Sequence, residues 1–343
     1  MTTATRRMDS FNSLGEFGKP GHGDAHQLDL ERMRTAIEER ITQLLAESGS
    51  QADMLAAAMR AGALSAGKRM RPLLVMLVAR DLGCTSPALV DVACAVEMVH
   101  AASLMLDDMP CMDNAQLRRG KPAIHVEYGE DVTILASVAL LSRAFGVLAA
   151  AQDIPPVTRT RLVARLAETI GTQGLVRGQF EDLHGPGSRT ADAIATTNEL
   201  KTGVLLGVAV DMAAIIAQTC DGVSQSLRAF ALAAGHAFQI RDDFHDIPGN
   251  DSALTGKDTG KDIGKATLLA SLGQEEAQRR LAAYLMDADR HLGDALGAGG
   301  GTRRFVDSLF AQAQGRARMR ADADTSLPYS DTVAARVREV HLN

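Results

Sequence analysis

Two clusters of aspartate, each at the end of a long apolar stretch, constrain this chain more than any other feature of its sequence. The segment "VACAVEMVHAASLMLDD" is apolar on nearly every side and ends at Asp107 and Asp108. A helix of this kind is buried, so these acids end a core helix, where the helix dipole does not stabilise them. Pro110 then turns the chain and lets Asp113 fold back toward the pair. The fold must supply a cation nearby.

A second cluster repeats the pattern. The apolar stretch "LRAFALAAGHAFQI" runs into "RDDFHD", which holds Asp242, Asp243 and Asp246. Asp242 and Asp246 are four residues apart and share one helical face. If the two helix ends face each other across a cavity, the carboxylates converge, and their repulsion in a cleft of low dielectric requires metal ions. Mg²⁺ is the natural candidate, because it prefers oxygen ligands, keeps several waters and shares its shell with substrate phosphates.

The acidic residues have two alternative interpretations. Either cluster alone could be a solvated helix end with its acids pointing outward. A calcium loop is the second alternative, because "DSALTGKDTGKD" has Gly256 at its sixth position and Asp262 at its twelfth. Ala253 and Thr255 lack the carboxylates that an EF-hand requires at positions three and five, which argues against such a loop.

Cationic residues gather in several short stretches at helix ends or in loops. They are Lys68, Arg69 and Arg71 in "SAGKRMRPLL", Arg118 and Arg119 in "LRRG", Lys201 beside Thr202 in "ELKTG", and Lys257, Lys261 and Lys265 in "LTGKDTGKDIGKATLL". Guanidinium groups bind phosphate oxygens in bidentate fashion. A single lysine is usually a solvated surface charge, and a lone His100 in an apolar helix is usually a core residue; Gln239 is equally ambiguous. The combination with two acidic clusters favours a site for small phosphorylated substrates.

Composition and periodicity predict an all-α chain. Apolar residues make up 46 % of the sequence, with 3 % aromatics and no Trp, which suits packed helices better than sheets. A helical stripe starts at Leu28, and helical signals continue to the end with only short breaks, giving about ten to twelve helices. No linker divides the chain. We therefore expect a loose arm over residues 1–27 and a single all-α domain over residues 28–343.

Charge and cysteine usage exclude several classes of protein. The net charge is −6 with both signs interspersed, so neither nucleic acid nor a membrane surface is an expected partner. Arg143 lies in the middle of the most apolar later stretch, which predicts a buried core helix and no transmembrane segment. The four cysteines show no C-x-x-C pair, and no secretory signal starts the chain, so a reducing cytoplasm is expected.

At these motifs the sequence resembles the trans-isoprenyl diphosphate synthases, also called polyprenyl synthetases, and within them the bacterial geranylgeranyl diphosphate synthases of carotenoid pathways. "DDMPCMD" followed by "LRRG" resembles the family's first aspartate-rich motif, and "DDFHD" resembles the second. "GKRMRP", "KTG", "FQIRDD" and "GKDTGKDIGKAT" resemble further signatures. The resemblance implies an isoprenoid synthase fold with helices around a deep central cavity, a homodimer, and roughly two or three Mg²⁺ ions for which Mn²⁺ can substitute.

The resemblance also implies a role for each motif residue. The metal set is Asp107, Asp108, Asp113, Asp242, Asp243 and Asp246. The isopentenyl diphosphate set is Lys68, Arg71, His100 and Arg119. The allylic diphosphate set is Arg118, Lys201, Thr202, Gln239, Lys257 and Lys265. Arg69 and Lys261 do not fall on binding positions. Asp107, Asp108, Asp242 and Lys201 are expected to be the catalytic residues.

The implied reaction is a Mg²⁺-dependent prenyl transfer. An allylic diphosphate (dimethylallyl, geranyl or farnesyl) loses its diphosphate in an apolar cavity that excludes water, and isopentenyl diphosphate attacks head-to-tail. In the family the helix level of Ala102 and Ser103 helps to set product length; both residues are small, so we expect a C20 product, geranylgeranyl diphosphate, with C15 farnesyl diphosphate as the alternative. A class I terpene cyclase needs no second diphosphate site, and a non-catalytic regulatory subunit would lack some of the acids.

Overall fold

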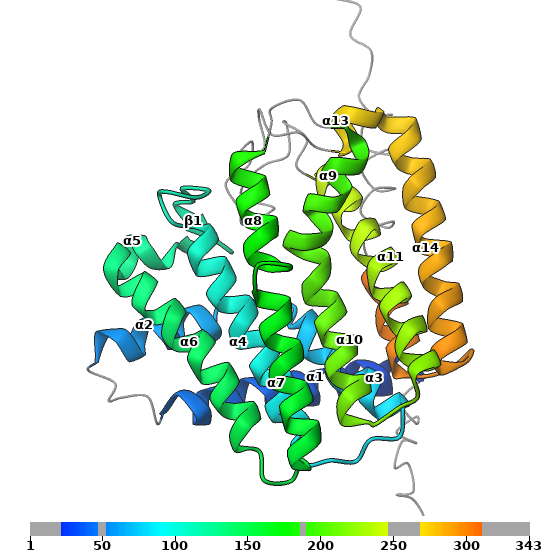
Figure 1. Cartoon of the computed structure of the whole chain (residues 1–343), viewed down its shortest axis with the longest axis horizontal. Helices are drawn as coiled ribbons and strands as arrows, with labels where there is room; N and C mark the ends of the chain where they lie inside the picture. Colours follow the sequence, from blue (N-terminus) through cyan, green and yellow to red (C-terminus); the bar gives the residue numbers. More distant parts are fainter. Residues whose placement is uncertain (1–21, 47–52, 186–189, 246–267, 311–343) are drawn as a thin grey trace, which may run out of the picture.

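The protein is a bundle of helices, as expected from its composition (Figure 1). The computed structural model describes residues 22–46, 53–185, 190–245 and 268–310 of the chain. The helices of the first half are α1 (His22–Ala46), α2 (Met54–Ala63), α3 (Met70–Asp81), α4 (Leu89–Asp107), α5 (Ile124–Tyr128), α6 (Glu130–Ala150) and α7 (Pro156–Ile170). The later ones are α8 (Leu175–His184), α9 (Ala191–Asn198), the π-helix η1 (Glu199–Gly203), α10 (Val204–Ile216), α11 (Asp221–His245), α13 (Leu268–Leu272) and α14 (Gln274–Leu296).

Three details differ from the sequence-based expectation. Thirteen bounded α-helices lie in the described part of the chain, one more than expected, because α5 and α13 are only five residues long. The strands β1 (Leu117–Arg118) and β2 (Lys121–Pro122) form a small antiparallel hairpin after α4. The first helix begins at His22 and not at Leu28, since polar residues extend a helix whose apolar anchors, Leu30 and Met33, come later.

The apolar helix α4 lies at the centre of the bundle. It packs against α6 and α3, with further contacts to α1, α2 and α10, and most of its residues are buried. This surrounding explains why the sequence of α4 shows no polar stripe. Two helices, α4 and α6, are long and apolar enough to cross a membrane by composition. Burial among other helices accounts for α4, whereas α6 is buried along one side only.

Helices α4 and α11 run toward the same end of the bundle, the upper end in Figure 1. Asp107 lies in the last turn of α4, and Asp242 and Asp243 lie in the last turn of α11, so the fold brings these acids to one end of the molecule. The β1–β2 hairpin, α8 and α13 are drawn at this end as well. The arrangement confirms the all-α class on which the candidate site depends.

A π-helix carries Lys201 between α9 and α10. The Val204 N–H donates to the carbonyl oxygen of Glu199, five residues earlier, which is the wide turn typical of π-bulges at functional sites. Gly178 of α8 lies directly against this turn, because a Cβ at Gly178 would come within 2.5 Å of the Lys201 backbone nitrogen. Close packing of α8 on η1 therefore fixes the position from which the lysine side chain starts.

Candidate active site

The first acidic cluster folds back on itself, as the proline after it predicted. Asp107 is the last residue of α4, and the Asp113 N–H donates to its carbonyl oxygen over 2.9 Å. The Ala115 N–H donates in the same way to the carbonyl oxygen of Asp108 (3.2 Å). These backbone bonds hold the loop after α4 in a tight turn, so the Asp113 carboxylate returns to the end of the helix.

The cation required at the end of α4 is Arg118. Its Nε donates to both carboxylate oxygens of Asp108 over 3.0 Å each, and a second guanidinium nitrogen contacts Oδ1. Asp108 is only 2 % exposed, so this ion pair replaces the water that the carboxylate loses. Burial opposes the charge on Arg118, but the hydrogen bond and the field of Asp108 outweigh burial and raise the pKa of Arg118. Asp108, predicted to bind metal, and Arg118, predicted to bind the allylic diphosphate, thus form an ion pair with each other in this structure.

Lys201 lies between acids from two elements. Its Nζ is 2.7 Å from Asp182 Oδ2 on α8 and 4.0 Å from Asp113 Oδ2. Burial opposes the charge of this lysine, but Asp107, Asp182 and Asp113 together raise its pKa. Burial raises the pKa of Asp107 to about 6; Lys201 opposes that shift and Asp113 adds to it. The sequence analysis missed Asp182, because no sequence motif indicates which acid will contact a lysine elsewhere in the chain.

The second acidic cluster divides into an exposed and a buried acid. The side chain of Asp242 is 55 % exposed and lies 3.5 Å from Arg241. Asp243 is buried: its Oδ2 accepts from the Leu268 N–H (3.0 Å) at the start of α13, and its Oδ1 accepts from Gln239 (3.1 Å). Asp243 thus tethers α13 to α11, a structural contact that the metal assignment did not anticipate.

Several residues named in the sequence analysis lie outside the described part of the chain: Asp246, Lys257, Lys261 and Lys265. The backbone of Thr202 is part of η1. Lys68 is exposed in the turn before α3. The expected roles of these residues therefore stay predictions.

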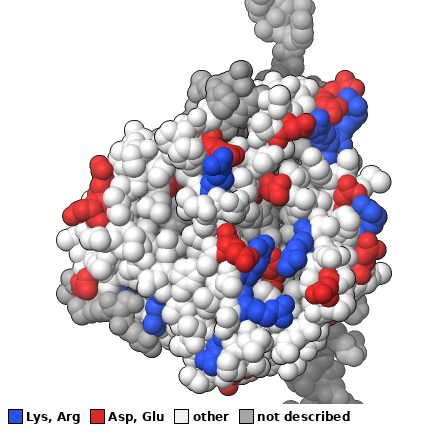
Figure 2. Space-filling view, in the orientation of Figure 1, with Lys and Arg blue, Asp and Glu red and all other residues white. Residues whose placement is uncertain are grey.

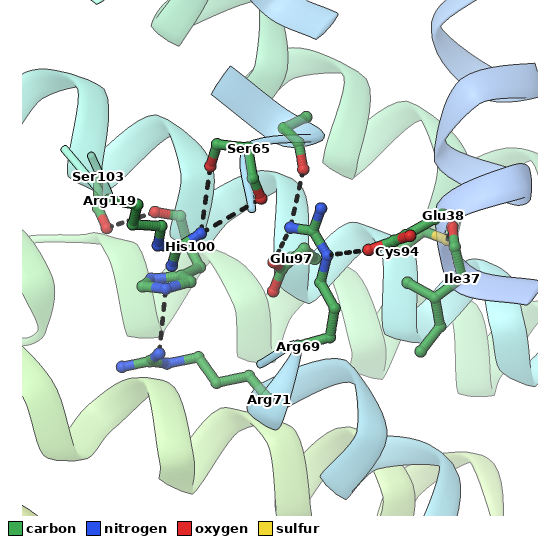
Figure 3. A network of polar contacts seen from close by, with 11 residues as sticks. Ile37, Glu38, Ser65, Arg69, Arg71, Cys94, Glu97, His100, Ser103 and Arg119 are labelled. Carbon is green, nitrogen blue, oxygen red and sulfur yellow. Dashed lines mark hydrogen bonds and ion pairs between the residues drawn. The ribbon is translucent and has the colours of Figure 1, made fainter. Parts of the chain in front are cut away.

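Three of the four predicted isopentenyl diphosphate residues, Arg71, His100 and Arg119, lie together at α4 (Figure 3). Arg71 Nη1 lies 3.1 Å from His100 Nε2, and Arg119 Nη1 donates to the Ser65 hydroxyl over 3.1 Å. A guanidinium only donates hydrogen bonds, so we assign His100 Nε2 as the acceptor and place the ring hydrogen on Nδ1. Nδ1 is buried and has no hydrogen-bond partner within the described residues. The imidazole therefore offers a neutral donor beside two cations.

Arg69, which the sequence analysis left out of the binding set, is buried in the same region (Figure 3). It donates to Glu97 Oε1 on α4 (2.7 Å), to Glu38 Oε1 on α1 (3.0 Å) and to the Ala63 carbonyl oxygen at the end of α2 (3.1 Å). These bonds join the turn before α3 to α1, α2 and α4. Glu97 was not anticipated, since it appears in the sequence as one acid in an apolar helix.

The two residues predicted to set product length, Ala102 and Ser103, lie on different faces of α4. His100, Ser103 and Asp107 follow each other at helical spacing and are all partly accessible, and the Ser103 hydroxyl donates to the His100 carbonyl oxygen (2.9 Å). Ala102 is fully buried among neighbouring helices. Ser103 thus lies on the same face as the first aspartate, whereas Ala102 faces the packed interior.

The acidic residues offer oxygen ligands for a divalent ion. No three His, Cys, Asp or Glu side chains among the described residues stand close enough to hold a metal by themselves. Mg²⁺ usually takes only one or two protein carboxylates and completes its shell with water and phosphate. Asp107 and Asp113 supply two such carboxylates, and burial already makes the charge on Asp107 unfavourable. The donor set fits Mg²⁺ bound together with a phosphorylated substrate.

Surface charge does not indicate a polyanionic partner on the visible face. In Figure 2, lysine and arginine side chains lie next to aspartate and glutamate, and this face has no continuous basic area. Such pairing gives little long-range attraction for nucleic acid.

His100 gives a pH-dependent prediction. Burial, followed by the charges of Arg71 and Arg119, lowers its pKa well below the usual value, so below about pH 6.5 the unfolded chain binds a proton that the folded chain does not. The contribution of His100 to stability should therefore fall as the pH drops from about 7.5 to 5.5. His100→Gln keeps an acceptor and a donor but does not titrate, so its free energy of unfolding, measured with urea, should fall less over this range.

The control is His184→Gln, at an exposed histidine of α8, which should follow the wild type. Equal losses of stability in the wild type and in His100→Gln would contradict a neutral, buried imidazole.

Comparison with known proteins shows the family of this chain. Residues 52–294 match the polyprenyl synthetase family. The chain is 48 % identical to a geranylgeranyl diphosphate synthase of Pseudescherichia vulneris over 285 residues (82 % of this chain, 91 % of that protein) and 39 % identical to a farnesyl diphosphate synthase of Geobacillus stearothermophilus over 271 residues (78 % and 91 %). A solved FPP/GFPP synthase from Zymomonas mobilis superposes with a TM-score of 0.71 at 32 % identity, covering 82 % of this chain and 99 % of that one. The chain therefore belongs to the polyprenyl synthetase family, as its motifs predicted.

Proposed function

We propose that this chain is a geranylgeranyl diphosphate synthase, a transferase that condenses isopentenyl diphosphate head-to-tail with an allylic diphosphate and releases diphosphate. The observation that carries the proposal is the presence of two separate charged groups beside one helix, α4. One joins Asp107 and Asp113 to Lys201; the other joins Arg71 to His100, with Arg119 nearby. Two diphosphates need two such groups. The relatives that are geranylgeranyl diphosphate synthases support the activity.

The residues suggest how the two substrates are kept apart. Lys201 stays charged, because the surrounding acids raise its pKa, and it can stabilise charge that builds on the departing allylic diphosphate. Arg71 and Arg119 offer guanidinium groups for the second diphosphate, and His100 offers a neutral Nδ1–H. The apolar residues of the surrounding helices exclude water from the allylic cation. Thr202, Gln239, Lys257 and Lys265 complete the predicted allylic site, and Lys68 the predicted isopentenyl site.

Mg²⁺ is the proposed cofactor, about two or three ions, with Mn²⁺ able to substitute. Asp107, Asp108, Asp113 and Asp242 would hold it, some through water, together with Asp243 and Asp246 from the second motif. Bound Mg²⁺ supplies positive charge to the leaving diphosphate. Release of Asp108 from Arg118 would free both of these residues for their predicted roles.

The first test concerns the metal. Asp107→Ala and Asp242→Ala should each lower turnover of labelled isopentenyl diphosphate by several orders of magnitude, because each removes charge that stabilises the transition state. Chelation should abolish the wild-type activity, and added Mg²⁺ should restore it. The control Asp287→Ala removes an acid on α14 that pairs with Arg290 and should leave turnover unchanged. Near-normal turnover in Asp107→Ala or Asp242→Ala would reject the metal assignment.

We propose a C20 product, with C15 as the alternative. The primer is dimethylallyl, geranyl or farnesyl diphosphate. The support is the small side chain of Ser103 on the accessible face of α4, one turn from Asp107. Ser103 itself presents no ring to a growing apolar tail at this level. The fully buried Ala102 would act indirectly, through the packing of α4.

A ring at this level should shorten the product. Ser103→Phe and Ala102→Tyr should shift the output from C20 toward C15, since overpacking typically costs about 1 to 3 kcal/mol, or roughly a five- to hundredfold bias against the last elongation. Chromatography of the dephosphorylated products measures the shift. Ala164→Phe, at an exposed position of α7, is the control. An unchanged C20 peak in both variants would show that this helix face does not line the tail channel.

A homodimer through α6 is also proposed. Ile134, Leu135 and Val138 are 45 to 58 % exposed on one side of this helix, although its sequence is apolar enough for a core helix. A second copy packed on this side would bury an apolar stripe that is too long for a typical surface helix. The edge position of α5 and α6 leaves room for such a partner (Figure 1).

The dimer can be tested with one buried charge. Val138→Glu should convert the dimer to a monomer, because the carboxylate would lose water in the interface. Light scattering after size exclusion gives the mass. Val157→Glu, at a valine that is 74 % exposed at the start of α7, is the matched control and should stay dimeric. A monomeric wild type, or a dimeric Val138→Glu, would overturn the proposal.

The other activities considered have less support. A class I terpene cyclase would not need the second group of cations around His100. A non-catalytic regulatory subunit would not keep both acidic clusters and Lys201. The four cysteines are free thiols, which supports the cytoplasmic location predicted for the enzyme.

A further inference from the structure

We propose that Glu97 and Arg69 form a positioning ion pair for the diphosphate of isopentenyl diphosphate, although both side chains bind protein groups and not the substrate. The inference rests on the proposed function and extends it to two residues that the binding motifs leave out. It concerns the turn between α2 and α3, which contains Lys68 and ends at Arg69, the N-cap of α3; Arg71 follows in the first turn of α3.

The backbone of this turn is held in an unfavourable conformation. Arg69 has φ 48° and ψ 35°, the left-handed region that a residue with a side chain rarely adopts. Its N-cap position makes no side-chain hydrogen bond to α3. The conformation therefore needs support from elsewhere, and the side chain of Arg69 supplies it.

The support comes from three helices (Figure 3). Arg69 Nη1 donates to Glu97 on α4 and to the last turn of α2, while Nε donates to Glu38 on α1. Arg69 and Glu97 are each only 4 % exposed, whereas the Glu38 side chain is 43 % exposed. Loss of one partner from a buried pair leaves the other charge uncompensated. Glu97 is therefore the acid on which the placement of Arg69 depends.

The same turn places three of the predicted substrate groups. Gly67 lies so close to Arg119 that a Cβ there would come within 2.5 Å of Arg119 Nη1, and Ser65 accepts two hydrogen bonds from this guanidinium. Arg71 follows Arg69 by two residues and contacts His100. His100 itself lies three residues after Glu97, one turn along α4. A shift of the Arg69 anchor would move these groups relative to one another.

Electrostatics gives a second reason to assign Glu97 a positioning role. Burial lowers the pKa of both Arg71 and Arg119, neighbouring guanidinium groups lower it further, and Glu97 opposes the shift in both. Burial raises the pKa of Glu97, but the neighbouring guanidinium groups, Arg69 first, oppose that shift. The Glu97 carboxylate thus offsets repulsion among these guanidinium groups. Among the described residues its hydrogen bond is to Arg69, so Arg71 and Arg119 keep donors for phosphate oxygens.

The test compares two buried acids. Glu97→Gln keeps the shape of the side chain and removes its charge; we expect the KM for isopentenyl diphosphate to rise about tenfold or more, with the KM for the allylic primer within about twofold and kcat within about threefold of the wild type. Asp211→Asn is the matched control: Asp211 is 1 % exposed and bonds to Arg165 and Arg228, each over 2.6 Å, on helices that do not carry Glu97. It should lower thermal stability and leave both KM values unchanged.

A second variant keeps the test decisive if Glu97→Gln does not fold. Arg69→Lys retains the charge but cannot bond three acceptors in the fork geometry of a guanidinium, and it should raise the same KM selectively. If folded variants leave the KM for isopentenyl diphosphate unchanged, or raise both KM values equally, the pair has a structural role only and the inference is overturned. A wild type that does not elongate an allylic primer with Mg²⁺ would instead reject the proposed function itself.

Discussion

The bidentate contact between Arg118 and Asp108 allows a buried apolar helix to end in charge, and the rest of the site depends on it. Without this cation, Asp108 would lose its hydration at the unfavourable end of a helix dipole. The contact also fixes the β1–β2 hairpin against α4. Arg119 follows with φ 55°, and this left-handed residue directs its own guanidinium to Ser65. One hairpin thereby serves two separate charged groups.

Much of this organisation could be predicted from the sequence. Helical periodicity and the scarcity of aromatic residues indicated an all-α chain, and the nearly unbroken apolar pattern of α4 indicated a central helix. The return of Asp113 followed from Pro110, because a proline restricts the preceding backbone and favours a turn. These features depend on local chain properties, and local properties are what a single sequence records. The family resemblance added the pairing of the acidic motifs.

The features that escaped prediction depend on contacts between distant residues. Asp182 meets Lys201 because α8 packs on η1, and Glu97 meets Arg69 across 28 positions of the sequence. Asp243 caps α13, a helix of five residues whose periodicity is too short to detect. In each case the sequence offers several possible partners for one charged side chain. Only the packing of helices decides which one it meets.

The wide turn of η1 shows what the fold gives up for its chemistry. A π-turn holds one residue more than an α-turn, and each residue advances a helix by about 100°. Removing one residue would join α9 and α10 into a continuous, more regular helix but would rotate everything before the join relative to the core. Selection for stability alone would favour the regular helix. The irregular turn that carries Lys201 marks a place where the direction of a single amino group has outweighed the regularity of the backbone.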